Sequence, residues 1–185
     1  YMQQKHWIVR QLSPLTEAMA RSADTQMEKR LESLHSVDNH IGQIVDLLER
    51  KGELENTYII YTSDNGFQLG QHRLVHDKRH LYEHNIRVPF IIVGPGVPKN
   101  VTSYRPVLNV DIAPSIYELI TGETETPSNM DGASIIPYLQ SLQAAIEADD
   151  AVNATIEDPN HRDDFLISYY GEGNPSCGLQ VIECN

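Results

Sequence analysis

The sequence predicts an α/β fold with a largely parallel sheet, because helical and strand patterns alternate along its 185 residues. In residues 25–52, apolar side chains recur every three or four positions, as on a helix that lies on a core. Residues 57–62 form a β-branched and aromatic run with little alternation, which is typical of a strand buried on both faces of a sheet. A second strand is predicted at residues 88–93.

The helix at residues 25–52 has signals at both ends. Thr25 with Glu28 fits a capping box at its start, and Gly52 fits a C-terminal stop. Its apolar stripe consists of Met27, Leu31, Leu34, Val37, Ile41, Ile44 and Leu48.

The remaining elements are shorter. A long polar connection at residues 63–87 is of the length that is usually functional or contains a short helix. A helix is predicted from Asn109 to Gly122, with Asp111 as its cap. The other expected elements are a short apolar element at 133–139, an exposed acidic insertion at 144–162 and a last strand at 165–170.

The amino-acid composition limits the kinds of partner that the protein can bind. Fourteen Lys and Arg residues stand against 26 Asp and Glu, a net charge of −12, which repels polyanions and argues against nucleic-acid binding. An anionic ligand would need a local cationic pocket, which a bound divalent cation can provide. The longest apolar run, at 88–93, is far shorter than the roughly 20 residues of a membrane span. With no signal peptide and Tyr1 in first place, the sequence reads as a fragment.

Two features of the sequence bear on the cellular compartment in which the protein resides. Asn100 and Asn153 each begin an N-glycosylation sequon, which suits a secreted or lysosomal protein. Cys177 and Cys184 are compatible with a small disulfide loop, with pairing to cysteines elsewhere, or with free thiols.

Oxygen ligands follow the first strand directly. Asp64 offers a carboxylate, Asn65 an amide oxygen, and Gly66 lets the backbone turn sharply. Ligands of α/β sheets bind beyond the carboxyl ends of strands, so these residues are a plausible half-site for Ca²⁺ or Mg²⁺. The alternative is an ordinary turn, since Asp, Asn and Gly are turn residues.

Cationic and histidine side chains lie further along the same connection. Lys78 could bind an anionic oxygen as a point charge, or it could be a solvated surface residue. Histidines recur at steps of four, which on one helix would share a face; zinc is one interpretation and exposed side chains are the alternative. These histidines are His72, His76, His80 and His84.

Several motifs, in order and at compatible spacing, resemble the sulfatases. The central one runs from Tyr61 to His72 and continues through Asp77-Lys78-Arg79-His80-Leu81-Tyr82-Glu83 to Ile86-Arg87-Val88-Pro89. Shorter matches are Lys5-His6-Trp7, Ser36-Val37-Asp38, Gly94-Pro95-Gly96, Asn109-Val110-Asp111, Met130-Asp131-Gly132 and Tyr170-Gly171-Glu172-Gly173. The likeness covers most of the chain and is greatest to N-acetylglucosamine-6-sulfatases.

This resemblance implies an alkaline-phosphatase-like fold, a mixed, largely parallel sheet flanked by helices that is incomplete in this chain. Residues 1–122 would be the carboxyl-side part of the catalytic α/β domain, and 123–185 its loop-rich end with the start of a smaller region. Asp64 and Asn65 would bind an active-site Ca²⁺. Lys78 would bind a sulfate oxygen and act in catalysis, and His72 would lie near the sulfate.

The family nucleophile is a formylglycine made from a Cys/Ser-x-Pro-x-Arg motif, which these residues lack. The implied function is hydrolysis of sulfate esters on glycans, with the 6-O-sulfate of N-acetylglucosamine in heparan or keratan sulfate as substrate. The isolated chain is expected to be inactive. The alternatives are another hydrolase of the superfamily, such as a phosphodiesterase or phosphonate hydrolase, and a non-catalytic glycan-binding module.

Overall fold

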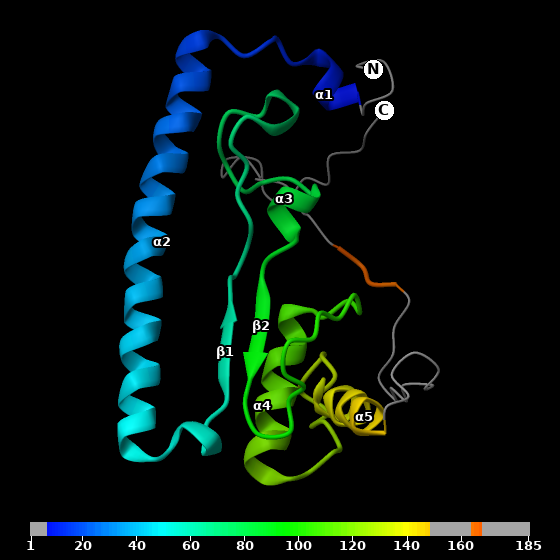
Figure 1. The fold of residues 1–185 in the computed structure, drawn as a ribbon. Helices are drawn as coiled ribbons and strands as arrows, with labels where there is room; N and C mark the ends of the chain where they lie inside the picture. Colours follow the sequence, from blue (N-terminus) through cyan, green and yellow to red (C-terminus); the bar gives the residue numbers. More distant parts are fainter. Residues whose placement is uncertain (1–6, 149–163, 168–185) are drawn as a thin grey trace. The chain divides into compact units, whose positions relative to one another are not determined.

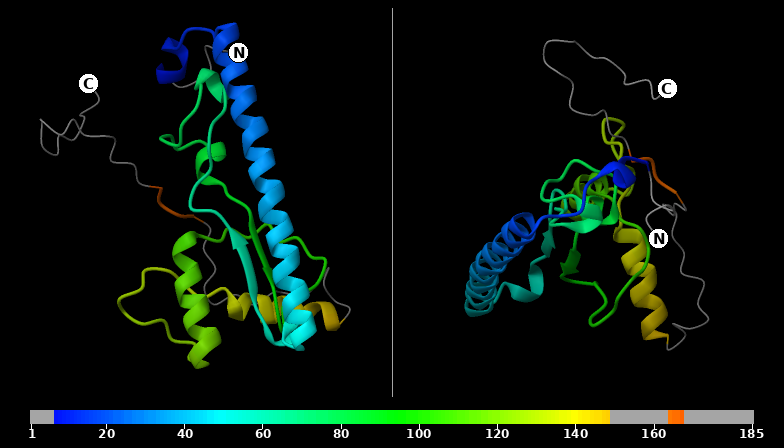
Figure 2. Two further views of the ribbon diagram at one scale, coloured as in Figure 1. Left: turned by 90° about the vertical axis from the view of Figure 1, so that its left-hand side faces the viewer. Right: turned by 90° about the horizontal axis from the view of Figure 1, so that it is seen from above.

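The protein is described here by a computed structural model, in which residues 7–148 and 164–167 are placed (Figures 1 and 2). These residues belong to two compact units. The first holds residues 7–50, 62–89 and 167, and the second holds residues 51–61, 90–148 and 164–166. The division at residue 122 that the sequence suggests stays a prediction.

The first unit contains the short helix α1 (Trp7–Gln11) and the long helix α2 (Glu17–Lys51). Helix α2 begins eight residues earlier than predicted, directly after Thr16, whose Oγ accepts a hydrogen bond of 3.2 Å from the Met19 N–H. The predicted capping box is therefore wrong, because its residues lie inside the helix. The predicted stop is confirmed, since Gly52 adopts a left-handed φ of 71° after the last turn.

The apolar stripe of α2 exists as a helical face, but it is not buried. Five of its seven members are exposed, and the helix buries Ala23 instead. The exposed five are Met27, Leu31, Leu34, Val37 and Ile44. The predicted helical periodicity is therefore confirmed. The core on which this face was expected to lie is not found among the described residues.

The sheet of the described residues has two strands, β1 (Ile59–Thr62) and β2 (Phe90–Val93). Both predicted strands are thereby confirmed, and they run in opposite directions (Figure 1), as a mixed sheet allows. The Tyr58 hydroxyl donates to the Pro95 carbonyl oxygen at 2.7 Å, just beyond the paired ends. Strand β1 is not buried on both faces as predicted, because a two-stranded sheet has no neighbouring strands or layers of its own to cover it.

Besides the strands, the second unit contains the short 3₁₀ helix η2 (Leu54–Asn56) and the helices that follow β2. Helix η4 (Asn109–Asp111) leads into α4 (Ile112–Thr121), which ends at Gly122 as predicted, and α4 contacts α5 (Ile136–Glu147). Helix α5 takes in part of the predicted apolar element and the first residues of the acidic insertion. The predicted last strand has no regular structure at 165–167, and its end lies outside the described residues.

Asp111 organises this helical region. Its carboxylate accepts hydrogen bonds of 2.9 Å from the backbone N–H groups of Leu108 and Ala133, which are 25 residues apart. Its carbonyl oxygen accepts from the Ser115 hydroxyl, whose oxygen accepts in turn from the Ile135 N–H at 3.0 Å. Asp111 and Ser115 are almost fully buried, so the loss of any one of these hydrogen bonds would lower the free energy of unfolding. The predicted cap is thus a link between η4, α4 and the start of α5.

Substitution of Asp111 by Ala should destabilise the second unit. Two buried N–H groups lose their acceptor, at about 1–3 kcal/mol for each unsatisfied group. We expect the urea midpoint to fall and amide exchange at Ala133 to accelerate, as followed by NMR. Asp131→Ala removes an exposed carboxylate and should change the free energy of unfolding by no more than about 0.5 kcal/mol. Equal effects of the two substitutions would contradict this role.

Candidate functional site

The candidate residues lie on the connection between β1 and β2, which folds back on itself within the first unit. Its two arms are joined by hydrogen bonds of 2.8 Å, from the Gly66 N–H to the Asn85 carbonyl and from the Gln68 N–H to the Asp77 carbonyl. The connection contains the short helices η3 (Gln71–Arg73) and α3 (Glu83–Ile86), as its length predicts. Residues that are 9 to 19 positions apart in sequence thus become neighbours.

Gly66 permits the closest approach between the arms. A Cβ atom built on this residue would lie 2.1 Å from the carbonyl oxygen of His84, which is backbone and cannot rotate away. Any other residue would push the arms apart. The glycine that the sequence suggested as a turn residue is therefore required for backbone packing.

Asp64 and Asn65 follow β1 directly. Asp64 is exposed, and its Oδ1 accepts a hydrogen bond of 2.9 Å from the Asn65 N–H. The Asn65 side chain is half-buried; its Nδ2 donates to the Gly66 carbonyl at 2.8 Å, which turns Oδ1 away from the backbone. A carboxylate and an oriented amide oxygen therefore stand side by side at the end of the strand.

Lys78 reaches this pair from the opposite arm. Its Nζ donates to Oδ1 of Asn65 at 3.1 Å, across 13 residues of sequence. The Lys78 backbone N–H donates to Oδ1 of Asp77 at 2.7 Å, and Oδ2 of Asp77 pairs with Nε of Arg79 at 2.9 Å. Asp77 therefore fixes the turn that carries Lys78, and the ammonium group meets the amide oxygen that the sequence suggested as a metal ligand.

Three of the four histidines gather around one tyrosine. The His72 ring lies 4.7 Å from the Tyr82 ring and 5.6 Å from the His84 ring, and Tyr82 stacks on His84 at 5.6 Å. The His80 ring lies 6.1 Å from the Tyr82 ring. His72 and His84 belong to different short helices, so the single helical face that a spacing of four suggests does not exist. His76 is exposed and takes no part in these ring contacts.

Two successive residues of this cluster's turn have strained backbones. His72 and Arg73 have φ values of 54° and 68°, in the left-handed region that non-glycine residues avoid. The Gly70 N–H bonds the Leu74 carbonyl at 2.7 Å, and Nη1 of Arg73 bonds the Leu12 carbonyl at 2.8 Å, which holds the turn in place. Strain of this kind, held by surrounding bonds, is common at functional sites.

The histidine cluster favours the neutral state of one member. Burial lowers the pKa of His84 below its ordinary value, and the nearby charges of His72 and then His80 lower it further. Nε2 of His84 is buried and has no hydrogen-bond partner among the residues that the structure describes. An uncharged His84 therefore suits this position.

Sequence reasoning missed the residues that join the arms. Gln68 and Asn85 are almost fully buried, and each contributes a backbone group to the bonds between the arms; Nδ2 of Asn85 also donates to the Asp77 carbonyl at 3.4 Å. A buried amide side chain in a polar segment has no sequence signal of its own. Tyr82 belongs to the sulfatase-like motif, and its place at the centre of the histidines was not foreseen.

Comparison with known proteins gives the family. The family model described as "Sulfatase" matches residues 2–122, which is more than half of the chain. The chain belongs to the sulfatase family. The resemblance on which the alkaline-phosphatase-like fold was expected is therefore confirmed.

Relatives of this sulfatase chain are longer proteins. The N-acetylglucosamine-6-sulfatase of Bos taurus is 41% identical over 178 residues, which are 94% of this chain and 29% of that protein. The human one is also 41% identical, over 94% of this chain and 30% of its own. An extracellular sulfatase SULF-1 homolog of Drosophila melanogaster is 40% identical over 90% of this chain and 14% of its own. The chain therefore spans less than a third of these relatives.

Two solved structures share the fold. One, described as in complex with its substrate D-glucosamine-2-N,6-O-disulfate, is 44% identical with a TM-score of 0.53, over 58% of this chain and 21% of its own. A phosphonate monoester hydrolase from Silicibacter pomeroyi is 33% identical with a TM-score of 0.52, over 56% and 20%. The described residues, with their helices and small sheet, are consistent with an incomplete domain of this fold.

Other expectations concern residues or groups beyond the site. Asn100 is exposed, in a left-handed conformation with φ of 58°, whereas Asn153, Cys177 and Cys184 lie outside the described residues. Within residues 7–148 and 164–167, no group of three or more His, Cys, Asp or Glu side chains could hold a metal ion. Over that same part of the chain, no helix is both long and apolar enough to cross a membrane.

Replacement of His72 by Gln should raise the pKa of His84. The substitution removes a neighbouring positive charge, so protonation of His84 becomes easier, while burial still holds its pKa below the ordinary value of 6.5. NMR titration of the histidine C–H signals measures the shift directly. His76→Gln removes an exposed histidine outside the cluster and should leave the titration of His84 unchanged. A pKa of His84 that does not move in His72→Gln would contradict the contact.

Proposed function

We propose that this chain contributes part of the active site of a sulfatase that hydrolyses the 6-O-sulfate ester of N-acetylglucosamine in glycosaminoglycans such as heparan or keratan sulfate. The observation that supports it best is the hydrogen bond of 3.1 Å between Nζ of Lys78 and Oδ1 of Asn65. It joins a cation suited to sulfate oxygens with an oxygen suited to a metal ion. The similar N-acetylglucosamine-6-sulfatases, and the neighbour bound to a glucosamine disulfate, support the substrate class.

Asp64 and Asn65 fit part of a Ca²⁺ site. Calcium takes six to eight oxygen ligands, and these residues offer one carboxylate and one amide oxygen at the end of a strand. The ammonium group of Lys78 on Oδ1 of Asn65 indicates that this oxygen attracts positive charge. When bound, the ion would supply Lewis-acid stabilisation of a sulfate oxygen. The remaining ligands would come from residues outside these 185.

The residues of this chain would bind and orient the sulfate group. Lys78 would hold a sulfate oxygen as a point charge and stabilise the negative charge that grows on it during bond cleavage. His72, in its strained turn, would lie beside the sulfate, with Tyr82 and His84 packed behind its ring. The nucleophile, a formylglycine in this family, would come from a motif that these 185 residues do not contain.

A phosphonate or phosphodiester hydrolase is the second candidate function. It is favoured by the similar fold of the phosphonate monoester hydrolase from Silicibacter pomeroyi. Lys78 and a metal site would serve a phosphoryl oxygen as well as a sulfuryl oxygen, so these groups do not separate the two substrates. The 6-sulfatase function has the wider support, because the relatives that cover 94% of the chain are N-acetylglucosamine-6-sulfatases.

A lysosomal or secreted location is part of the proposal. The exposure of Asn100 and of Thr102 in its sequon would allow glycosylation there. Asn153 would be a second acceptor. The Drosophila relative is described as extracellular, in line with this location.

Lys78 can be tested in a graft, in which this chain replaces the 178 matched residues of the human relative so that the missing residues are present. The graft should release sulfate from N-acetylglucosamine 6-sulfate. Lys78→Ala should lower kcat/KM by about 10²–10³-fold, as expected when one transition-state donor is lost. Lys99→Ala removes an exposed lysine elsewhere and should leave kcat/KM unchanged. A graft that folds and cleaves a phosphonate ester, but no sulfate ester, would favour the second candidate function.

Asp64→Ala in the same graft tests the metal site. Loss of a carboxylate ligand should abolish both calcium binding and sulfate release, because the cation would no longer be held against the substrate oxygen. Calcium content, measured by mass spectrometry of the purified protein, gives a readout that is independent of activity. Normal calcium content with retained activity would rule out Asp64 as a ligand.

A further inference from the structure

An open cleft of about 360 Å³ lies within the first unit, between helix α2 and the residue that follows Gly66. Its volume is within the range of ligand-binding clefts. Gln26, Lys29 and Arg30 are three and four residues apart, so they share one face of α2, and Phe67 completes the lining. Among the described residues, no Asp or Glu lines this cleft. Its charged lining residues are therefore cations alone.

Arg30 is held in the cleft by an aromatic ring. Its guanidinium lies over Phe67, 5.6 Å from the ring centroid, and the ring attracts this cation without neutralising its charge. A guanidinium stacked on a ring keeps the N–H groups at its edge available to oxygen acceptors. Neither Arg30 nor Lys29 forms an ion pair with a carboxylate in the part of the chain that the structure describes. Two uncompensated positive charges therefore line one cleft, on a chain of net charge −12.

The cleft adjoins the candidate site through the chain itself. Phe67 follows Asn65 by two residues, which span at most about 7 Å between their Cα atoms. Asn65 is the residue whose side chain meets Nζ of Lys78, the proposed ligand of the cleaved sulfate. A substrate with a second anionic group can therefore reach Arg30 while its first sulfate is held at Lys78.

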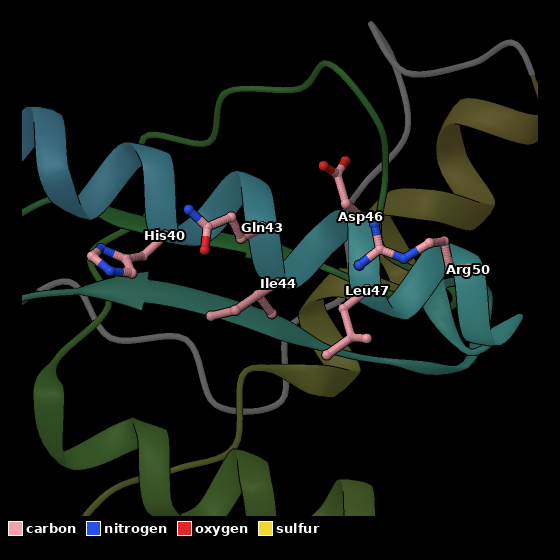
Figure 3. Close-up of a pocket in the computed structure, with 6 residues that line it drawn as sticks. All are labelled: His40, Gln43, Ile44, Asp46, Leu47 and Arg50. Atoms are coloured by element: carbon pink, nitrogen blue, oxygen red, sulfur yellow. The ribbon is translucent and has the colours of Figure 1, made fainter.

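A second pocket on α2 has a different charge balance. It has a volume of about 410 Å³, and its lining residues all project from this one helix (Figure 3). They are His40, Gln43, Ile44, Asp46, Leu47 and Arg50. In this pocket Asp46 offsets the charge of Arg50, whereas no acid offsets Arg30 in the cleft at Phe67. Arg50 is thus a matched control, an exposed arginine on the same helix.

We infer that the cleft formed by Lys29, Arg30 and Phe67 binds a second anionic group of the sulfated glycan, apart from the sulfate that is cleaved. This group is a carboxylate or a sulfate, because both present the pair of oxygens that the edge of a guanidinium binds. The inference rests on the proposed function, since Lys78 would hold the first sulfate. It makes Arg30 a specificity residue that favours glycans with two neighbouring anionic groups over singly sulfated sugars.

The test uses the graft described above and three probes. They are N-acetylglucosamine 6-sulfate, glucosamine 2-N,6-O-disulfate, and a disaccharide in which a hexuronic acid adjoins N-acetylglucosamine 6-sulfate. Arg30→Ala should raise KM at least about fivefold for the disulfate, for the disaccharide or for both, because a charge-assisted contact at an exposed site is lost. Whichever of the two responds shows whether the second group belongs to the same sugar or to the next one. The value of kcat should not change, since Arg30 does not touch the bond that breaks.

Two controls accompany this measurement. KM for the singly sulfated sugar should stay the same in Arg30→Ala, and KM for every probe should stay the same in Arg50→Ala. Phe67→Leu keeps Arg30 but removes the ring that holds its guanidinium, so it should raise KM for the same probe by a smaller factor, about twofold. The inference is overturned if Arg30→Ala changes KM for no probe, or changes it equally for the singly sulfated sugar and the other two.

An inactive graft gives no KM, so binding of the disulfate and of the disaccharide is also measured by isothermal titration calorimetry with the same variants. Binding that depends on Arg30 in a graft that releases no sulfate would contradict the proposed function and leave the cleft intact. Sulfate release that is normal, with binding indifferent to Arg30→Ala, would overturn the inference and leave the proposed function intact.

Discussion

The backbone contact between Gly66 and Asn85 is the constraint on which the candidate site depends. It brings the two arms of one connection so close that no Cβ fits between Gly66 and the carbonyl oxygen of His84. At that separation Lys78 reaches Asn65 from the opposite arm, and Tyr82 and His84 reach His72. Site geometry therefore comes from backbone pairing that is local in sequence, within about 20 residues.

Local pairing also explains why elements of this chain keep their form while their surfaces stay uncovered. Helix α2 is held by bonds between residues four apart, which need no other part of the protein. Strands β1 and β2 pair with each other across one connection. Burial is different, because it needs residues distant in sequence, and for α2 and β2 these are not among the described ones. Leu31 on α2 and Ile91 on β2 are both exposed.

The same distinction sets what the sequence could predict. Periodicity predicted α2 and its end at Gly52, because both depend on neighbours in the chain. It placed the start of α2 eight residues too late, because the first turns hold Met19 as their only large apolar residue and the cap at Thr16 is a single hydrogen bond. Strand direction could not be derived from composition. Burial of the first strand on both faces was predicted wrongly, because an apolar run indicates what a strand prefers and not whether its partners are present.

For the site, the sequence identified single residues better than their contacts. Asp64, Asn65 and Lys78 were selected by residue type and by resemblance, and the structure adds the contact between Asn65 and Lys78. The histidines were noticed for a helical spacing that does not exist, since their segment contains two short helices and a left-handed turn. Their convergence on Tyr82 is a result of the folded arms. A rule based on sequence spacing assumes that the residues share one helix or strand. It fails where the chain reverses direction.

Charge at the site gives a final reason why a metal ion belongs to the proposed mechanism. Asp64 contributes −1 and Lys78 contributes +1, while Asp77 and Arg79 form an ion pair of their own, so the charges of these four groups cancel. A neutral site on a chain of net charge −12 does not attract a sulfate ester. His84 adds no charge near neutral pH, because burial and its histidine neighbours lower its pKa. A divalent cation on Asp64 and Asn65 would make the sum positive, and with it the electrostatic attraction that an anionic substrate requires.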